Sequence, residues 1–523
     1  MRRAFCVFTV LFQEQKLPVP GMAKLVSDFK EWKFQSPPNY AELPIDENPE
    51  YNVPVAVKNA VFSKVPTEPL TGKLHLVCAS DEALSDILDL DPKVSETEEF
   101  INFIAGIYAP EGTLSVSHRK GESWQPQLKG SGKTPYSRFG DGRAVLRSSI
   151  REMVASEACH HLGIPTTRAG ALVVSDDHKV WRDKTYSGMS RQERAAVVLR
   201  IAPAWYRIGS FEILQKRNEP QLAKTFADFI IKHHFPHIDL NDENRYVEFY
   251  SEVAHRNLDM VATWQGIGFV HGVLNTDNIS LLGLTIDYGP YGFIDHYYEH
   301  YVPNSSDDMG RYAFNKQPEI ILWNLEKFAV ALEPILTEEN KEKLKVFFKT
   351  LDTYVKDKIL KTYLSKFGLE TVKDGDVSLV KEFLQLMQET SADFTCTFRQ
   401  LAEIDKDQLL EKDILYKKWS LAKISKAGGW GKWVGTYKAR LLSENVSDEE
   451  RRARMLKVNP LYVPRNWILQ EAIADAEKND FHKVRLLLKI FRKPYEINEE
   501  AEELGYSAQP PSWSFGLKLS CSS

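Results

Sequence analysis

The chain has few cysteines for its length, and none of them stands next to another. The 523 residues include five, which are Cys6, Cys78, Cys159, Cys396 and Cys521. They form no C-x-x-C pair, and no histidine lies at metal-ligand spacing from any of them. The pattern therefore indicates neither a zinc site nor a disulfide framework, and it fits a reducing compartment.

The sequence also lacks a long apolar run and a strong charge of either sign. No stretch approaches the ~18 apolar residues of a membrane span, so we expect none. The net charge of −5 argues against a dedicated nucleic-acid binder, which needs a concentrated basic patch. Hydrophobic residues make up 43% and charged residues 27%, as is ordinary for a globular chain, so neither wholesale disorder nor a fibrous class is expected.

The first 60 residues show no sustained hydrophobic period. They are rich in proline and acidic residues, which predicts an extended leader over a core, with a disordered tail as the alternative. Arg2 and Arg3 are followed by no acidic residue before Glu14. This start predicts mitochondrial targeting, and an untargeted, cytoplasmic chain is the alternative.

Hydrophobic periods predict an α+β fold whose mixed front half precedes a helical second half. We expect helices at 80–106, 148–163, 245–265, 320–332, 340–367 and 381–387, and strands at 113–116, 123–128, 169–175 and 195–201. This order is typical of a bilobed protein-kinase-like fold with a large helical C-terminal extension. The expected parts are the leader at 1–60, an N-lobe-like nucleotide-binding region at 61–205, a C-lobe-like catalytic region at 206–335, and the helical extension with its cysteine-containing tail at 336–523.

One motif has the layout of a kinase catalytic loop without its base. His271-Gly-Val-Leu-Asn-Thr-Asp-Asn278 keeps the seven-residue step of H-R-D-L-x-x-x-N, and Asp287-Tyr-Gly289 follows where kinases have D-F-G. The position of the kinase base is Val273, and a hydrocarbon cannot accept a proton. Asn278 and Asp287 supply the oxygen ligands that magnesium prefers. Asp277 is the best remaining proton acceptor, and His271 is expected to hold the loop backbone through hydrogen bonds.

Other charged residues occur in the order that kinases use. Lys129 ends a predicted strand and Glu152 lies on the next helix, an arrangement that orients a lysine towards nucleotide phosphates. Each residue alone is a weak signal, because unrelated surface charges are common.

Two arginine-containing segments are further candidates for phosphate contact. Gly140 and Gly142 flank Asp141, which indicates a tight turn that faces either a phosphate or solvent. Asp141 is also a candidate acceptor for a ribose or base. Nearby cations are Arg138, Arg143, Arg147 and Arg151. Arg200 and Arg207 flank a proline turn, and they form either a polyphosphate clamp or structural salt bridges.

Long motifs in the chain closely resemble the selenoprotein O family. They are Leu128-Lys-Gly-Ser-Gly-Lys-Thr-Pro-Tyr-Ser-Arg-Phe-Gly-Asp-Gly-Arg143, with its continuation to Glu152, Gly163-Ile-Pro-Thr-Thr-Arg168, His271 to Asp295, Gly310 to Pro318, and Asn459-Pro-Leu-Tyr-Val-Pro-Arg-Asn466. The similarity covers nearly the whole chain after about residue 40.

The resemblance implies a kinase-like fold that binds ATP in an inverted orientation. Such an enzyme transfers AMP to Ser, Thr or Tyr hydroxyls of protein substrates. On that pattern, the nucleotide is contacted or positioned by Lys129, Asp141, Gly142, Glu152, Arg200, Arg207 and Asp287. Asn278 and Asp287 would hold Mg²⁺, with Mn²⁺ as the alternative, and Asp277 would accept the proton. The inversion would explain Val273, because a different phosphorus then faces the acceptor hydroxyl.

The chain departs from the family pattern at two places. Vertebrate members carry selenocysteine where this chain has Cys521, so a redox role of the tail stays open. Family members also have a glycine-rich segment before the lysine strand, where this chain has only residues 107–128. Because a phosphate-covering loop needs glycines for close backbone approach, the alternative function is a catalytically impaired pseudokinase that binds partners.

Overall fold

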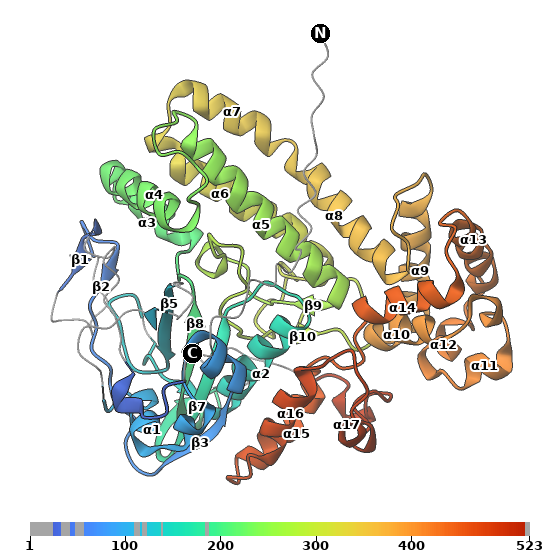
Figure 1. Cartoon of the computed structure of the whole chain (residues 1–523), viewed down its shortest axis with the longest axis horizontal. Helices are drawn as coiled ribbons and strands as arrows, with labels where there is room; N and C mark the ends of the chain where they lie inside the picture. Colours follow the sequence, from blue (N-terminus) through green and yellow to red (C-terminus); the bar gives the residue numbers. More distant parts are fainter. Residues whose placement is uncertain are drawn as a thin grey trace.

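The structure is a computed structural model that describes residues 25–32, 42–47, 57–108, 116–117, 123–137, 140–183 and 188–517. Within these residues the fold is mixed α/β, and helix predominates. Figure 1 shows a sheet with its flanking helices in the lower part of the molecule, long helices above it and a group of shorter helices to the right. The predicted targeting segment and Cys521 lie outside the described residues.

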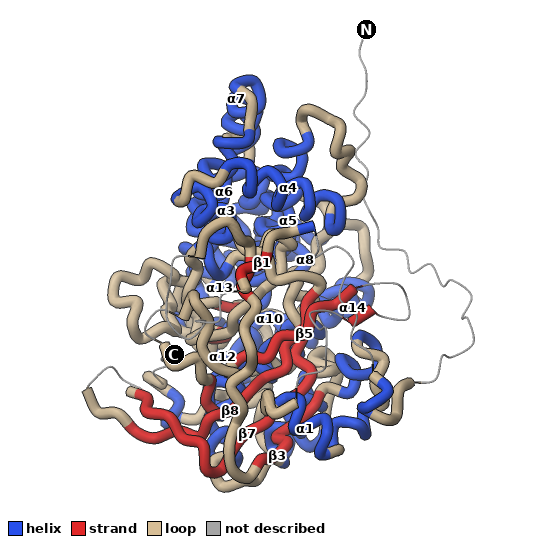
Figure 2. Tube along the Cα trace, turned by 90° about the vertical axis from the view of Figure 1, so that its left-hand side faces the viewer, coloured by secondary structure: helices blue, strands red, loops and turns tan. Residues whose placement is uncertain are grey.

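The main sheet is built around a long antiparallel hairpin. Its strands follow the order β3 (Leu74–Ala79), β7 (Arg168–Arg182), β8 (Arg191–Ala202), β5 (Ser123–Lys129) and β4 (Val116–Ser117), and β6 (Ala144–Val145) also pairs with β8. All these pairs are antiparallel, and Figure 2 shows the strands side by side. The expected hairpin of β4 and β5 and the expected strands at 169–175 and 195–201 are confirmed.

Alternation along β7 and β8 gives the sheet two apolar faces. Leu172, Val174, Ala196 and Val198 face α2 (Leu146–His161) and belong to one core cluster. The alternate residues, which are Ala171, Val173, Ala195, Val197, Leu199 and Ile201, belong to a second cluster with α1 (Glu98–Ile104). Parts of the predicted leader join this second cluster, because Phe29 and Trp32 are only 4% and 7% exposed there. A helix therefore covers each face, and α2 occupies the one that carries Arg200.

The rest of the described chain is mainly helical. The helices are α3 (Ile208–Lys216), α4 (Pro220–His234), α5 (Arg245–Ile267), α6 (Gln317–Leu332), α7 (Glu338–Phe348), α8 (Leu351–Lys366), α9 (Asp376–Thr390), α10 (Phe394–Glu403), α11 (Lys412–Tyr416), α12 (Trp419–Ile424), α13 (Trp430–Leu442), α14 (Asp448–Val458), α15 (Asn466–Ala476), α16 (His482–Phe491) and α17 (Glu499–Glu503). Two short strands, β9 (Phe269–Val270) and β10 (Gly292–Phe293), pair between α5 and α6. The helices expected at 148–163, 245–265, 320–332 and 381–387 are confirmed, with shifted ends.

The helical second half is divided between two cores. Helices α9 to α13 contribute to a cluster that contains Phe383, Trp433 and Tyr437. Residues from α15 to α17, among them Trp467 and Leu487, instead join the cluster of α2 and α5. Figure 1 shows the same return, with α15 and α16 beside α2. The end of the chain thus packs against the sheet-bearing part.

Two long helical predictions were wrong in their continuity. The run expected at 80–106 is broken after residue 88, because Asp89 is left-handed (φ 57°) and Pro92 begins a separate turn. The run expected at 340–367 is split at 349–350. There the Thr350 hydroxyl donates to the Phe347 carbonyl at 2.7 Å and competes with the helical hydrogen bonds. Both breaks come from local side-chain chemistry that an apolar period does not register.

None of the described helices combines the length and the apolar composition that crossing a membrane requires.

Lys366 makes the stability of the helical part depend on pH. Its side chain is 3% exposed, and its ammonium lies 4.3 Å from the ring centre of Phe398. Burial lowers the pKa of Lys366 to about 7, from 10.5. The unfolded chain therefore binds more protons than the folded chain between these values, so the free energy of unfolding rises with pH there, by at most about 1.4 kcal/mol per pH unit.

We predict that Lys366→Met removes this rise and stabilises the protein at neutral pH. Urea unfolding at several pH values between about 7 and 9.5 measures it. Lys361→Met, an exposed position on the same helix, serves as the control and should leave the slope unchanged. Identical slopes for the Lys366 variant and the native protein would contradict the account.

Candidate functional site

Strand register places the first members of the site on one face of the sheet. In the pairing of β5 with β8, Gln127 lies opposite Arg200 and Lys129 lies opposite Val198. Because side chains two residues apart share a face of a strand, Gln127, Lys129 and Arg200 all point to the side that α2 covers. Glu152 projects from α2 towards the same place.

A single charged network links five of the predicted site residues. The Lys129 ammonium lies 2.6 Å from Glu152 Oε2, and Arg200 Nη1 donates to Glu152 Oε1 at 3.0 Å. Arg200 Nη1 also lies 2.5 Å from Asp287 Oδ1, and Arg207 Nη1 lies 2.7 Å from Asp287 Oδ2. Because the network is continuous, removing any one member changes the partners of the next.

Burial gives this network its energetic weight. Glu152 and Arg200 are 3% and 5% exposed, so each needs its charged partners to offset desolvation. Burial alone would raise the pKa of Asp287. The nearby charges of Arg207, Arg200 and Lys129 outweigh burial and hold this pKa far below its ordinary value. Asp287 therefore stays ionised at every physiological pH. Three cations face two carboxylates, and the excess of positive charge suits an anionic ligand.

Arg200 is further fixed by neighbours that sequence reasoning missed as partners. Its Nη2 donates to the Gln127 side-chain carbonyl, and its guanidinium lies 4.6 Å from the ring centre of Trp205. Trp205 in turn donates to the Gln125 carbonyl at 3.1 Å. The two-residue spacing of Gln127 and Lys129 was a usable signal, whereas nothing in the sequence pairs Gln127 with Arg200.

Arg207 connects the network to the loop that contains the predicted base. Its Nη1 donates to the Asp277 main-chain carbonyl at 2.7 Å. Asp277 and Asn278 lie in the short turn Thr276–Asn278, where the Asn278 amide donates to the Val273 carbonyl at 3.0 Å. Asp287 itself is left-handed, with φ 57°, a conformation that aspartate tolerates better than most residues. The structure thus brings Asp277 and Asn278 next to the charged network.

The interior of the loop is held by His271, as its sequence position suggested. His271 is 1% exposed, and its Nε2 lies 2.8 Å from the Ile286 carbonyl, to which it donates. Its Nδ1 is then free to accept the weak hydrogen bond from the Val273 N–H at 3.4 Å. Burial lowers the pKa of His271, so the ring is neutral and supports the backbone.

Asp141 and Gly142 lie outside this network. Asp141 forms a bidentate ion pair with Arg182, at 2.8 Å for each nitrogen–oxygen contact. Burial alone would raise the pKa of Asp141, but Arg182 lowers it below the ordinary value. Gly142 is left-handed (φ 71°), and a Cβ there would lie 2.1 Å from the carbonyl of Gly132. The turn is therefore packed against the segment that follows Lys129. Sequence reasoning missed Arg182, which no spacing connects to Asp141.

The arginines expected near this turn have structural partners instead. Arg143 donates to the Glu68 carbonyl, Arg147 pairs with Glu193 at 3.2 Å, and Arg151 donates to the Tyr291 carbonyl. Arg147 and Arg151 are both buried and point into the interior, so neither is a cation beside a phosphate-facing or solvated turn. Arg138 lies outside the described residues.

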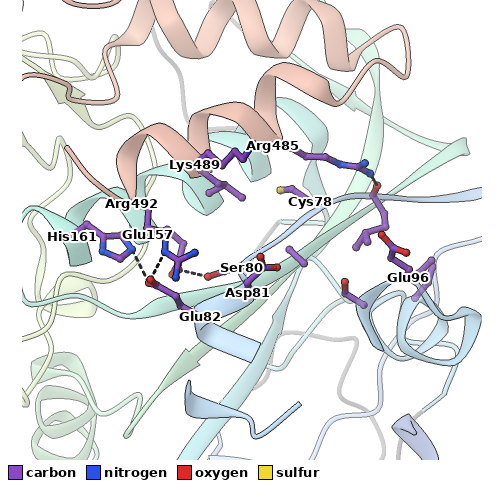
Figure 3. A pocket seen from close by; sticks show the side chains of 15 residues that line it. Cys78, Ser80, Asp81, Glu82, Glu96, Glu157, His161, Arg485, Lys489 and Arg492 are labelled. Carbon is purple, nitrogen blue, oxygen red and sulfur yellow. Dashed lines mark hydrogen bonds and ion pairs between the residues drawn. The ribbon is translucent and has the colours of Figure 1, made fainter. Parts of the chain in front are cut away.

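A cavity of about 470 Å³ lies away from the network, between β3, the end of α2 and α16. Figure 3 shows Glu82 in contact with two other side chains of the cavity wall, those of His161 and Arg492. Glu82 lies 3.0 Å from His161 and also forms an ion pair with Arg492. Glu157 forms an ion pair with Arg168 at 2.7 Å. None of the predicted site residues lines it.

Comparison with known proteins assigns the chain to a family. A model of the protein adenylyltransferase SelO family matches residues 111–492. The chain belongs to the SelO family. The resemblance to selenoprotein O seen in the motifs is thereby confirmed.

Curated relatives match the chain over most of their length. The protein nucleotidyltransferase YdiU of Flavobacterium johnsoniae is 38% identical over 520 residues, which span 92% of this chain and 97% of the relative. The protein of the same name from Pseudomonas fluorescens Pf0-1 is 38% identical over 497 residues, 89% and 96% of the two chains. That from Enterobacter sp. 638 is 41% identical over 425 residues, 80% and 82%. The chain is therefore a nucleotidyltransferase of the SelO family.

The network also generates a stability prediction. We expect Arg200→Gln to lower the free energy of unfolding by about 3–5 kcal/mol, because it leaves the buried Glu152 and the partly exposed Asp287 with too little positive charge. Arg207→Gln should cost clearly less, since Arg207 is 25% exposed and water can replace it. Chemical denaturation of both variants measures the difference. An equal or smaller loss at Arg200 would show that the network does not have this role.

Proposed function

We propose that this SelO-family protein transfers AMP from ATP onto Ser, Thr or Tyr hydroxyls of other proteins. The observation that carries the proposal is the cationic network around Asp287, next to a loop whose base position is the hydrocarbon Val273. The network suits a polyphosphate, and the missing base argues against the ordinary kinase transfer of the terminal phosphate. The family assignment supports the nucleotidyl class of the reaction.

On this proposal the molecule is a bilobed kinase-like enzyme with the nucleotide between its two parts. The sheet with α2 forms the first lobe, and α3 to α6 form the base of the second. Glu152 orients Lys129 towards the phosphates, while Arg200 and Arg207 bind phosphate oxygens with their guanidinium forks. Asp141 and Gly142 remain proposed nucleotide contacts. For Asp141 to contact the nucleotide, its carboxylate has to accept hydrogen bonds from both Arg182 and the ligand.

The oxygen donors beside the network fit a nucleotide-bound magnesium, with manganese as the alternative. Because the Asn278 amide nitrogen is held by the Val273 carbonyl, the Asn278 side-chain oxygen is the atom left for a cation. Asp287 has an ionised carboxylate whose oxygens accept more than one partner each. No group of three or more His, Cys, Asp or Glu side chains that could hold a metal occurs among the described residues. Magnesium commonly uses one or two protein ligands together with phosphates and water, so Asn278 and Asp287 suffice.

The proposed reaction is a displacement at the α-phosphorus of ATP. The hydroxyl oxygen of the protein substrate forms a bond to that phosphorus, the bond to the bridging oxygen of the β-phosphate breaks, and pyrophosphate leaves. Asp277 takes the hydroxyl proton. Lys129, Arg200 and Arg207 stabilise the charge that builds up on the phosphate oxygens, and a bound magnesium would add to that charge stabilisation.

Labelled ATP tests this function directly. With Mg²⁺ and a protein acceptor, α-labelled ATP should label protein and γ-labelled ATP should not. Asp287→Asn should abolish the labelling, whereas Asp374→Asn, at an exposed position far along the chain, should leave it unchanged. Label that appears only from γ-labelled ATP would overturn the proposal in favour of a kinase.

The alternative is a catalytically impaired pseudokinase that binds partners. The short stretch at 107–128 favours it, because the family's glycine-rich run is missing there. Much of that stretch lies outside the described residues. The same experiment separates the two, since the alternative predicts ATP binding without any transfer of label.

Gly209 offers a test of Asp277 in which no charged residue is substituted. A Cβ on Gly209, in the first turn of α3, would lie 2.2 Å from Asp277 Oδ1. Gly209→Ala therefore has to displace the carboxylate. We expect the rate of AMP transfer to fall about tenfold or more, with ATP affinity nearly unchanged.

Initial rates and equilibrium ATP binding measure the two effects separately. Gly435→Ala is the matched control, because a Cβ there meets no atom. An unchanged transfer rate in Gly209→Ala would contradict the role of Asp277 as the proton acceptor.

A further inference from the structure

Arg151 is a buried cation that the proposed transfer of AMP does not use. It precedes Glu152 on α2 and is 4% exposed. Among the described residues no carboxylate forms an ion pair with it, and burial lowers the pKa of its guanidinium. A buried charge without an opposite charge is costly, so the contacts that replace the ion pair indicate what Arg151 does.

The first of these contacts ties α2 to the segment after Asp287. Arg151 Nη2 donates to the Tyr291 carbonyl at 2.6 Å, and the guanidinium lies 4.2 Å from the centre of the Tyr291 ring. The Tyr291 hydroxyl donates back to the Arg151 carbonyl at 2.8 Å. The helix that carries Glu152 is therefore joined to the segment that carries Asp287 by three contacts between two buried residues.

The second contact ties α2 to a residue 315 positions later in the chain. Arg151 Nη1 donates to Asn466 Oδ1 at 3.0 Å, and Asn466 is the first residue of α15. Asn466 Nδ2 donates to the Tyr301 hydroxyl at 3.3 Å. A Cβ on Gly292 would lie 2.6 Å from that hydroxyl and 3.2 Å from Asn466 Nδ2, so the backbone of β10 approaches this junction closely.

Asn466 itself is firmly placed. The preceding Arg465 is 1% exposed and pairs with Asp393 at 2.7 Å and with Asp295 at 2.5 Å. Helices α15 and α16 also pack against α2, as Figure 1 shows. The C-terminal helices thus meet α2 at the residue next to Glu152 and are anchored on their other side to the segment after β10.

We infer that Asn466, acting through Arg151, is a positioning residue for the nucleotide site. It fixes the rotation of α2 about its axis and the position of α2 along that axis. Glu152 then reaches Lys129 with one carboxylate oxygen and Arg200 with the other. The helices α15 and α16 are then a working part of the site, although they lie far from it in sequence. This inference rests on the proposed function only in naming ATP as the ligand.

The test measures binding of ATP with Mg²⁺, without any transfer step. Asn466→Ala should weaken ATP binding about tenfold, because Arg151 loses a charged hydrogen bond and α2 loses one of its two ties. Asn466→Asp keeps the acceptor oxygen and should restore the affinity to within about twofold of the native value. Gln470→Ala, on the same helix, is the control and should have no effect.

A double-mutant cycle separates positioning from general damage. If Asn466 acts through Glu152, then Asn466→Ala should weaken ATP binding much less in a Glu152→Gln background than in the native one. Equal losses in both backgrounds, or an Asn466→Asp variant as weak as Asn466→Ala, would overturn the inference. Because the measurement is binding, a chain that binds ATP but transfers no AMP would overturn the proposed function alone.

Discussion

The site is organised around the buried guanidinium of Arg200. It joins Glu152 of the helix over the sheet to Asp287 of the loop below, at 3.0 and 2.5 Å. A charge at 5% exposure has to be satisfied, so the sheet, α2 and the loop have to meet at this point. Lys129 pairs with Glu152, and Arg207 pairs with Asp287. Three cations therefore face two carboxylates, and the excess positive charge is available to a ligand.

Much of this site is predictable from the sequence because its residues follow the order of the kinase motifs. Lys129 ends a strand, Glu152 lies on the following helix, and Asn278 and Asp287 keep the kinase order, so each was identifiable before the fold was known. The pairing of Arg200 with Gln127 was not predictable, because it depends on which residues face each other across β5 and β8. Whether these residues act on a nucleotide stays a prediction.

The parts that escaped prediction depend either on contacts distant in the sequence or on local interruptions of a helix. The partner of the Asp141 carboxylate is Arg182, which lies 41 residues later on the long hairpin and is linked to Asp141 by no sequence spacing. The predicted helices at 80–106 and 340–367 ignored local breaks at Asp89 and Thr350. The return of α15 and α16 to α2 left no periodic signal at all, since an amphipathic helix does not specify which surface it covers.

A crystal structure with a non-hydrolysable ATP analogue and Mg²⁺ would show whether the charged network of Lys129, Glu152, Arg200, Arg207 and Asp287 binds the triphosphate. Phosphate oxygens should then lie within hydrogen-bonding distance of Lys129 and Arg207, and the cation should lie between Asn278, Asp287 and the phosphates. A nucleotide bound elsewhere, with every ion pair of the network unchanged, would contradict this prediction.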